Sequence, residues 1–463
     1  YEIAPLEGGK SGGLARVAGL LRQLEAENPN TIAVLAGDFL SPSFMGNLKM
    51  DDGERIAGLQ MVETLNALGL DYATFGNHEF DLKTLDLVEK RVSQSTFQYM
   101  TCNALAVEAD KQRPFQQGEE AVPEYLVHTF GEGANSLKLA FVGVVLPFNQ
   151  QDYVHYEDVT TSFATAVKAA RGEADVVLGL THLNLEDDEA LAAAVPGLPL
   201  FIGGHEHHHL TSKIGATTIT KADANAKTVY IHRFRHDPSS GQTTFTSELI
   251  PITADTPTDP ETEAVVKNWQ DRLDGLIADM GYDPHQKLTT LKEPLQGTEA
   301  AIRSKQTNYG KLTNEAFQSM MPGADVYCFN GGSLRVDDNL SGTITTFDIL
   351  RSFPYGGPIV KMEMNGRQLD SLLTIGQTIN VGKGGYLQRL GAERGRHAWI
   401  INGRPLEEKQ TYQVILPKFV ADGREANLEF LGPIPYVSPA QFTPRGGPVK
   451  NDIRDILVYY LGH

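Results

Sequence analysis

Residues 31–38 of the chain read TIAVLAGD, a short apolar run that ends in glycine and aspartate. Such a run is typical of a buried strand followed by a tight turn. The pattern recurs where Asp71–Phe75 precedes GNHEFD (76–81), Asp175–Leu180 precedes Thr181-His182, and Leu198–Ile202 precedes GGHEH (203–207). Polar side chains therefore follow each of these predicted strands at the point where the strand ends.

Ligands of open α/β sheets bind beyond the carboxyl ends of the strands, so we expect these side chains to meet at one edge. The groups on offer are carboxylate, amide and imidazole, which suit Zn, Mn, Fe, Co or Mg better than thiophilic ions. Two such ions about 3.5–4 Å apart would clamp a phosphoryl group and make a bound water acidic. The candidate ligands are Asp38, Asn77, His182, His205 and His207.

Each signal also has an ordinary structural interpretation. A histidine after a strand can be a hydrogen-bonding residue, and HEHHH (205–209) can be a solvated loop. Asp38 can cap a helix, and Asn77 can be a turn residue. Their recurrence at successive strand ends favours the metal site.

The segments between these strands have helical periodicity, so the first 250 residues predict an α/β domain. A further buried strand is predicted over 137–146. Predicted helices cover 11–26, 56–68, 163–171 and 187–194.

The second part of the chain changes character at Pro251–Pro260, a linker-like stretch rich in Pro, Thr and Asp. A helix is predicted over Glu261–Met280, with Val265, Trp269, Leu273 and Leu276 on one face. A mixed α/β domain follows. Its predicted helices are 310–321, 346–353 and 452–461, and its predicted strands are 324–329 and 412–416. The whole chain therefore divides into a first domain over 1–250, a linking helix over 251–285 and a second domain over 286–463.

The composition restricts the class of protein. The net charge of −18 argues against a nucleic-acid polymer as partner, although a small anionic substrate is compatible with a locally positive cleft. No apolar run is long enough for a membrane span, and no signal peptide is visible. Cys102 and Cys328 could form a disulfide or be two buried free thiols, and the oligomeric state stays open.

The sequence resembles the 5′-nucleotidase family of calcineurin-like metallophosphoesterases. The resemblance rests on GDFLSPS (37–43), GNHEFD (76–81), THL (181–183), GGHEH (203–207), NGGSLR (330–335), FPYGG (353–357) and ILPKF (415–419). It covers nearly the whole chain. It implies an N-terminal α/β/β/α sandwich, joined by a helix to a mixed α/β substrate-binding domain, and export to the periplasm or the exterior.

The resemblance also implies roles for individual residues. Asp38 would bridge two divalent metals, Asn77, His182 and His205 would complete one site, and His207 would ligate the other ion. His78, paired with Asp81, would stabilise charge on the transferring phosphoryl group. Asp81 can alternatively be the N-cap of a helix over 82–92.

In the second domain the resemblance implies that Tyr355 and Phe419 sandwich a nucleobase. Both can alternatively be core residues, and this alternative is stronger for Phe419 than for Tyr355, which lies in a turn rich in Pro and Gly. Asn330 and Arg335 would bind substrate, or Arg335 would form a surface ion pair.

Three departures from the family pattern affect these expectations. The Asp-x-His motif is absent, so we expect the natural chain to carry that strand upstream of Tyr1; a chain without it would be a weakened or single-metal enzyme. Arg303 and Lys305 stand where the family tends to place a phosphate-binding arginine. Glu425 would replace the acid that contacts the sugar.

The function that the resemblance implies is hydrolysis of nucleoside 5′-monophosphates. Two alternatives are a phosphodiesterase or pyrophosphatase for cyclic nucleotides, UDP-sugars or dinucleotides, and a non-catalytic nucleotide-binding protein with a decayed site. A Rossmann-type oxidoreductase is disfavoured because no G-x-G-x-x-G opens a helix after a strand.

Overall fold

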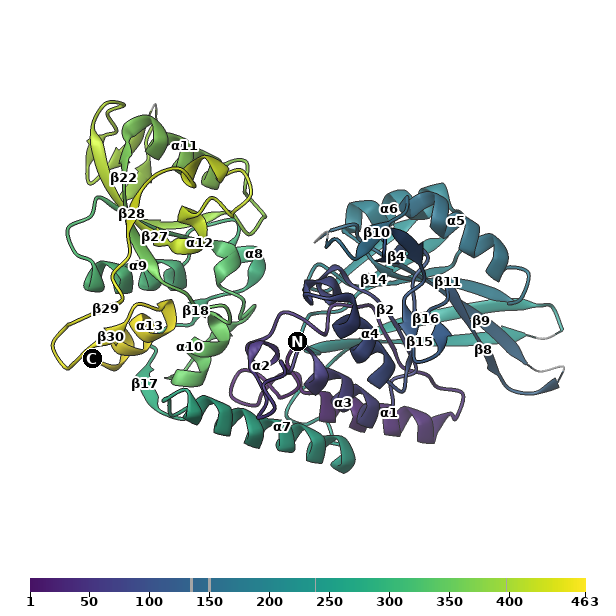
Figure 1. Cartoon of the computed structure of the whole chain (residues 1–463). Helices are drawn as coiled ribbons and strands as arrows, with labels where there is room; N and C mark the ends of the chain where they lie inside the picture. The colour runs from purple at the N-terminus through teal and green to yellow at the C-terminus, as the bar shows by residue number, and fades with distance from the viewer. Residues whose placement is uncertain (134–135, 149–150, 238, 397) are drawn as a thin grey trace. The chain divides into compact units, whose positions relative to one another are not determined.

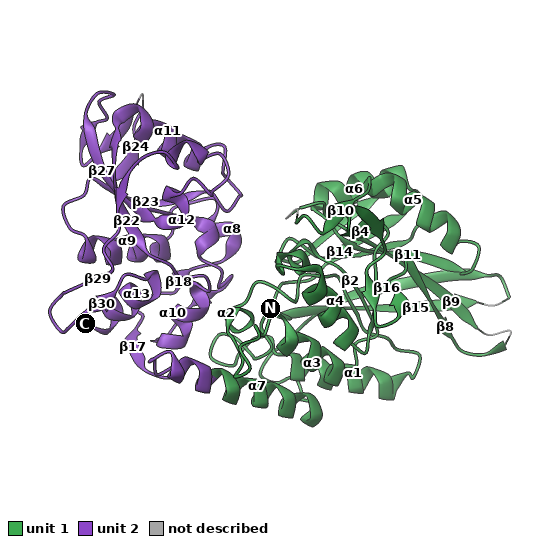
Figure 2. Cartoon of the chain, viewed as in Figure 1, with its two compact units in different colours: residues 1–273 green, residues 274–463 purple. Residues whose placement is uncertain are grey.

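The computed structural model describes residues 1–133, 136–148, 151–237, 239–396 and 398–463 (Figure 1). The chain divides into two compact units, Tyr1–Leu273 and Asp274–His463 (Figure 2). Each unit has its own sheets and its own hydrophobic clusters. In the part of the chain that the structure describes, no helix has the length and apolar character needed to cross a lipid bilayer.

The first sheet of unit 1 is parallel, with the strand order β1-β2-β3. A helix between successive strands returns the chain to the end of the sheet at which the next strand starts, as parallel pairing requires. The strand predicted over 31–36 is shorter at both ends, and the Thr31 hydroxyl donates to Asn28 O at the end of the preceding helix (2.6 Å). The elements are α1 (Leu14–Glu27), β1 (Val34–Leu35), α3 (Leu59–Leu68), β2 (Tyr72–Thr74), α4 (Leu85–Gln94) and β3 (Gln98–Met100).

The second sheet of unit 1 has the order β13-β14-β12-β11-β9-β8. Its central strands are parallel, and the two edge strands are antiparallel. The strands are β8 (Tyr125–Phe130), β9 (Leu137–Val145), β11 (Val176–His182), β12 (Leu200–Gly203), β13 (Leu210–Ile214) and β14 (Thr217–Lys221).

One face of this sheet packs against α5 (Val159–Ala170) and α6 (Leu185–Ala194) through a cluster that includes Phe163 and Phe201. The other face packs against the first sheet, where Leu178 and Met100 share a cluster. With the helices of the first sheet, this arrangement is the α/β/β/α sandwich predicted for the N-terminal half, which is confirmed. The polar strand ends therefore belong to two packed sheets, and the expectation of one sheet edge was wrong.

The remaining elements of unit 1 are short or lie outside these two sheets. They are α2 (Phe44–Asn47), η1 (Asn77–Asp81), β4 (Ala104–Glu108), β5 (Lys111–Arg113), β6 (Gln116–Gln117), β7 (Glu120–Ala121), β10 (Val154–Tyr156), β15 (Thr228–Asp237) and β16 (Gln242–Pro251).

Helix α7 (Pro260–Asp279) contains the boundary between the units. Trp269 and Leu273 are buried, as predicted from the periodicity. Val266 and Ile277 are buried in place of Val265 and Leu276. Both sets fit a spacing of three or four residues, so the sequence pattern does not distinguish them.

Unit 2 is built on a mixed sheet with the order β23-β19-β27-β22-β28. One face packs against α9, α10 and α13, and the other packs against α11. This mixed α/β fold confirms the class predicted for the C-terminal half. The elements are α9 (Asn308–Met320), β19 (Val326–Asn330), α10 (Thr346–Ser352), β22 (Ile359–Asn365), α11 (Gly366–Gln377), β23 (Leu387–Leu390), β27 (Thr411–Pro417), β28 (Tyr436–Val437) and α13 (Ile453–Gly462).

Shorter elements of unit 2 surround this sheet. They are β17 (Lys287–Thr290), β18 (Leu295–Gln296), α8 (Glu299–Ile302), η3 (Gly331–Ser333), β20 (Asn339–Leu340), β21 (Thr343–Thr345), β24 (Ala392–Arg394), β25 (Trp399–Ile401), β26 (Arg404–Pro405), α12 (Lys418–Ala421), η4 (Glu429–Leu431), β29 (Gln441–Phe442) and β30 (Val449–Lys450).

The two cysteines are buried free thiols, Cys102 in unit 1 and Cys328 in unit 2. Of the two interpretations that the sequence left open, the structure supports the free thiols. Burial raises the pKa of the Cys328 thiol to about 12, so it stays protonated and unreactive at neutral pH.

Candidate metal centre

Asp38 lies in the turn after β1, in a backbone conformation that L-residues adopt rarely. Its φ is 58°, and that of the preceding Gly37 is 75°. A Cβ atom on Gly37 would overlap the backbone of Gly76, and one on Gly76 would overlap the Asp38 carboxylate. The two glycines therefore allow the turn after β1 to touch the turn after β2. The His78 N–H in turn donates to Asp38 Oδ1 (2.8 Å).

Glu79 holds these two turns together, a role that the sequence analysis missed. Its buried carboxylate accepts backbone hydrogen bonds from Gly76 (2.5 Å), Asp38 (2.8 Å), Phe39 (2.7 Å) and Leu40 (2.9 Å). The sequence signal that could have identified Glu79 is an acidic residue inside a turn that begins with glycine. Such turns leave several backbone N–H groups in need of an acceptor.

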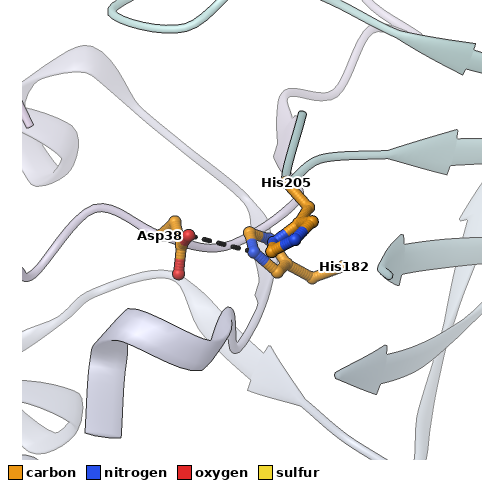
Figure 3. Close-up of side chains that lie close together, drawn as sticks. All are labelled: Asp38, His182 and His205. Carbon is orange, nitrogen blue, oxygen red and sulfur yellow. Dashed lines mark ion pairs between the residues drawn. The ribbon is translucent and has the colours of Figure 1, made fainter. Parts of the chain in front are cut away.

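His182 and His205 reach Asp38 from the second sheet. His182 ends β11, donates from Nδ1 to Ala36 O (2.6 Å), and places Nε2 3.0 Å from Asp38 Oδ2. His205 follows β12 with its Nδ1 3.2 Å from Oδ1 of the buried Asn77. One candidate ligand atom from each of Asp38, His182 and His205 lies within 4.8 Å of the others (Figure 3). The structure thus brings these predicted residues together with Asn77.

The protonation states of Asp38 and His205 suit a cation, whereas His182 holds its proton more tightly than a free imidazole. Burial raises the pKa of Asp38, but His182 and His78 outweigh it, so the net pKa is well below the usual range. Burial lowers the pKa of His182, yet Asp38 reverses this, and the net pKa is raised. Burial, and then His182, lower the pKa of His205 to about 4. At neutral pH His205 is therefore the neutral imidazole that a metal binds, and Asp38 is ionised.

His78 and Asp81 form the predicted pair. His78 Nδ1 lies 2.8 Å from Asp81 Oδ2, and the Ser41 hydroxyl donates to the same oxygen (3.1 Å). The interpretation of Asp81 as a helix N-cap is wrong. Thr84 caps α4, which begins at Leu85, and its side chain accepts from Leu87 N.

His207 lies outside the group of three ligand atoms found among the described residues. Its ring packs edge-on against Tyr1 at 6.3 Å between centroids, and Tyr1 packs in the same way against His78 at 6.2 Å. Tyr1 was also missed, since a single aromatic residue carries no pattern. The next histidines of the run, His208 and His209, are exposed.

In unit 2, the Asn330 amide donates to Glu425 Oε2 (2.7 Å), which joins two of the predicted substrate residues. Burial raises the pKa of Glu425. Arg303 is half-buried and pairs with Glu299 (2.7 Å), whereas Lys305 is exposed. Arg335 is half-buried, and its backbone N–H donates to Ser352 O (2.8 Å).

The two aromatic residues predicted to hold a base are both exposed, Tyr355 at 56% and Phe419 at 47%. The interpretation of Phe419 as a core residue is therefore wrong. Phe419 lies in α12, directly after β27, and its neighbour Val420 is the buried residue, as is Leu416 in β27.

Comparisons with known proteins agree with this fold. Residues 10–209 match the calcineurin-like phosphoesterase family, and residues 287–430 match the 5′-nucleotidase C-terminal domain. Fold and site thus define a calcineurin-like phosphoesterase, an enzyme that hydrolyses phosphoric esters. With both matches in this order, the chain belongs to the 5′-nucleotidase family of these enzymes, as the motifs indicated.

Individual relatives match most of this chain at low identity. The 5′-nucleotidase of Bos taurus is 22% identical, over 89% of this chain and 78% of its own. The trifunctional nucleotide phosphoesterase YfkN of Bacillus subtilis is 24% identical, over 83% of this chain and 28% of its own. The structure of a 5′-nucleotidase precursor from Thermus thermophilus superposes with a TM-score of 0.76 at 21% identity, covering 99% and 94% of the two chains.

Proposed function

We propose that the chain hydrolyses the phosphate ester of nucleoside 5′-monophosphates in a metal-dependent reaction. The observation that carries the proposal is the group of Asp38, His182 and His205, whose ligand atoms lie within 4.8 Å of one another. The buried Asp38 carboxylate and the neutral His205 imidazole lie side by side, and this pair fits a divalent cation. The cation would stabilise the charge of the carboxylate and bind the imidazole nitrogen. The names of the relatives supply the nucleotide as substrate class.

In this proposal Asp38, Asn77, His182 and His205 hold one ion, and Asp38 and His207 hold a second. Divalent ions bound here would acidify a water and bind phosphoryl oxygens. The number of ions and their identity, among Zn, Mn, Fe, Co and Mg, are part of the proposal. The hydrogen bond from His182 Nδ1 to Ala36 O supports it, because it leaves Nε2 as the atom directed at the ion.

The His78–Asp81 pair is proposed to stabilise the transferring phosphoryl group. A carboxylate at 2.8 Å from Nδ1 orients the imidazole ring. The His78 backbone is itself bound to Asp38, so the ring is held beside the proposed metal ligand. The chemistry is therefore assigned to unit 1.

Unit 2 is proposed to select the substrate. Glu425, held by Asn330, would accept hydrogen bonds from a sugar hydroxyl. Tyr355 and Phe419 are available for stacking on a base because both rings are exposed. Arg303, Lys305 and Arg335 would contribute positive charge toward phosphate.

A second candidate is a nucleotide phosphodiesterase or pyrophosphatase, which the trifunctional relative favours. The full chain is assayed with Mn²⁺ or Zn²⁺ against AMP, 2′,3′-cyclic AMP, a UDP-sugar and bis-p-nitrophenyl phosphate. We expect turnover of AMP. Hydrolysis of the diesters alone would reject the monophosphate assignment in favour of the second candidate. A protein that binds metal but turns over none of the panel would be the non-catalytic alternative.

Export to the periplasm or the exterior is also proposed, by resemblance to the family. Cell fractionation with an antibody to the chain tests it. Recovery with cytoplasmic markers would contradict export and leave the catalytic assignment untouched.

A further inference from the structure

Three charged side chains meet in the interior of unit 1 beside the HEH segment, residues 205–207. The Lys221 ammonium lies 2.7 Å from Asp188 Oδ2 and 2.5 Å from Glu206 Oε2. The side chains of Lys221 and Asp188 are 1% and 0% exposed, and that of Glu206 is 17% exposed. The proposed chemistry uses none of these residues.

The contacts of Lys221 lead to both loops that carry histidines. Its ammonium also donates to Leu183 O (2.6 Å), directly after His182. Glu206 stands between His205 and His207, and its second carboxylate oxygen accepts from Leu185 N. One ammonium thus ties the loop after β11 to the loop after β12.

The position of Lys221 in the sheet makes this tie possible. Lys221 ends β14, where it pairs with Gly203, the last residue of β12. A Cβ atom on Gly203 would lie 3.0 Å from Lys221 Cε and 3.1 Å from Cγ. The missing side chain of Gly203 therefore leaves room for the lysine to run beneath the HEH segment.

Two residues of the HEH segment have strained backbone conformations. His205 has a φ of 88° and His207 a φ of 59°, both in the region that L-residues adopt rarely. Such conformations persist where the surrounding structure determines them. The carboxylate of Glu206, between the two histidines, is the group through which Lys221 holds them.

A buried ion cluster is weak evidence for a role in stability, because desolvation offsets the attraction between the charges. The cluster could alternatively serve only to stabilise the core. Measurements of metal affinity and of stability on the same variants distinguish this alternative from a positioning role. We propose that Lys221 is a positioning residue that sets the geometry of His182, His205 and His207 through Leu183 O and Glu206. The inference rests on the metal-dependent function proposed above.

The test measures metal binding by the full chain, with Mn²⁺ as the probe in isothermal titration calorimetry. Lys221→Met removes the charge and keeps the length of the side chain. Loss of a group that orients metal ligands lowers metal affinity by about 10- to 100-fold, and we expect a decrease in this range. The Mn²⁺ EPR spectrum should change as well, because the surviving ligands adopt a different geometry.

Glu206→Gln is the second variant, and it keeps the measurement possible if Lys221→Met does not fold. Lys221 retains Asp188 in this variant, so a buried pair remains. If Lys221 acts through Glu206, the two substitutions together should weaken Mn²⁺ binding by less than the product of their separate effects.

Arg91→Met is the matched control. Arg91 is a buried cation of the same unit that donates to the carbonyl groups of Arg55, Ile56 and Ala57. We expect it to lower the melting temperature without changing Mn²⁺ affinity. Equal losses of affinity in Arg91→Met and Lys221→Met would overturn the inference, as would a folded Lys221→Met with wild-type affinity. A wild-type chain that binds neither Mn²⁺ nor Zn²⁺ would overturn the proposed function together with it.

Discussion

Asp38 Oδ2 lies 3.0 Å from His182 Nε2, although the two residues stand at the ends of strands in different sheets. The imidazole and the carboxylate form an ion pair, with side chains that are 1% and 7% exposed. A divalent cation held by these two side chains would compete with the proton on His182.

Metal affinity should increase with pH through the neutral range. The pKa of His182 is raised by Asp38 against the opposing effect of burial, so the ring is protonated below that pKa. Binding through Nε2 releases this proton, and the apparent affinity therefore falls as pH decreases and levels off once His182 is neutral. Calorimetry of Mn²⁺ binding in two buffers of different ionisation enthalpy measures the proton release. Buffer-independent heats below the pKa would contradict the ion pair.

His207 and His209 belong to the same run of residues, but only His207 should affect metal content and kcat. His207→Ala should reduce the metal content per chain, determined by elemental analysis, and lower kcat, because His207 is proposed to hold the second ion. His209→Ala is the control, since its side chain is 61% exposed and faces Asp223 at 3.5 Å. Equal metal content in His207→Ala and wild type would remove His207 from the site.

The His78–Asp81 pair should affect the chemical step and not metal binding. Asp81→Asn removes the charge that orients the His78 ring, and we expect kcat for AMP to fall by about 100-fold, as for the loss of one preorganised group. Metal content should be unchanged. Ser41→Ala, which removes the other hydrogen bond to Asp81, serves as a milder comparison. A fall in KM with no change in kcat would be evidence against this role.

Glu79 should contribute strongly to the stability of unit 1. Glu79→Ala leaves several buried backbone N–H groups without their acceptor, and we expect a loss on the order of 3 kcal/mol in the free energy of unfolding. Trp269 is in unit 1 and Trp399 in unit 2, so urea unfolding in a Trp399→Phe background reports unit 1 through fluorescence. Glu120→Ala, at an exposed position, is the control. A loss no larger than that of the control would argue against the role of Glu79.

Phe419 should matter most for substrates that carry a base. Stacking contributes about 0.5–1.5 kcal/mol, so Phe419→Ala should raise KM for AMP by roughly 2- to 12-fold. KM for p-nitrophenyl phosphate should change less. Val437→Ala removes another exposed apolar side chain of unit 2 and should leave both values unchanged. Parallel increases for both substrates after Phe419→Ala would point to a structural effect.

The sequence by itself determined the α/β class, the family, and the strand ends that carry Asp38, His182 and His205. These features are local, because an apolar run, a glycine and a polar residue are adjacent in the chain. The same locality identified the His78–Asp81 pair, whose members are three residues apart in one turn.

Only the tertiary structure decided how these pieces meet. The packing of two sheets brings together turns that are more than a hundred residues apart, and no sequence period records such a contact. Glu79 and Lys221 bind backbone groups of distant or neighbouring loops, so their roles depend on where those loops lie. Exposure of Phe419 was likewise settled by packing, because a residue of the short helix α12 can face either the core, as Val420 does, or solvent.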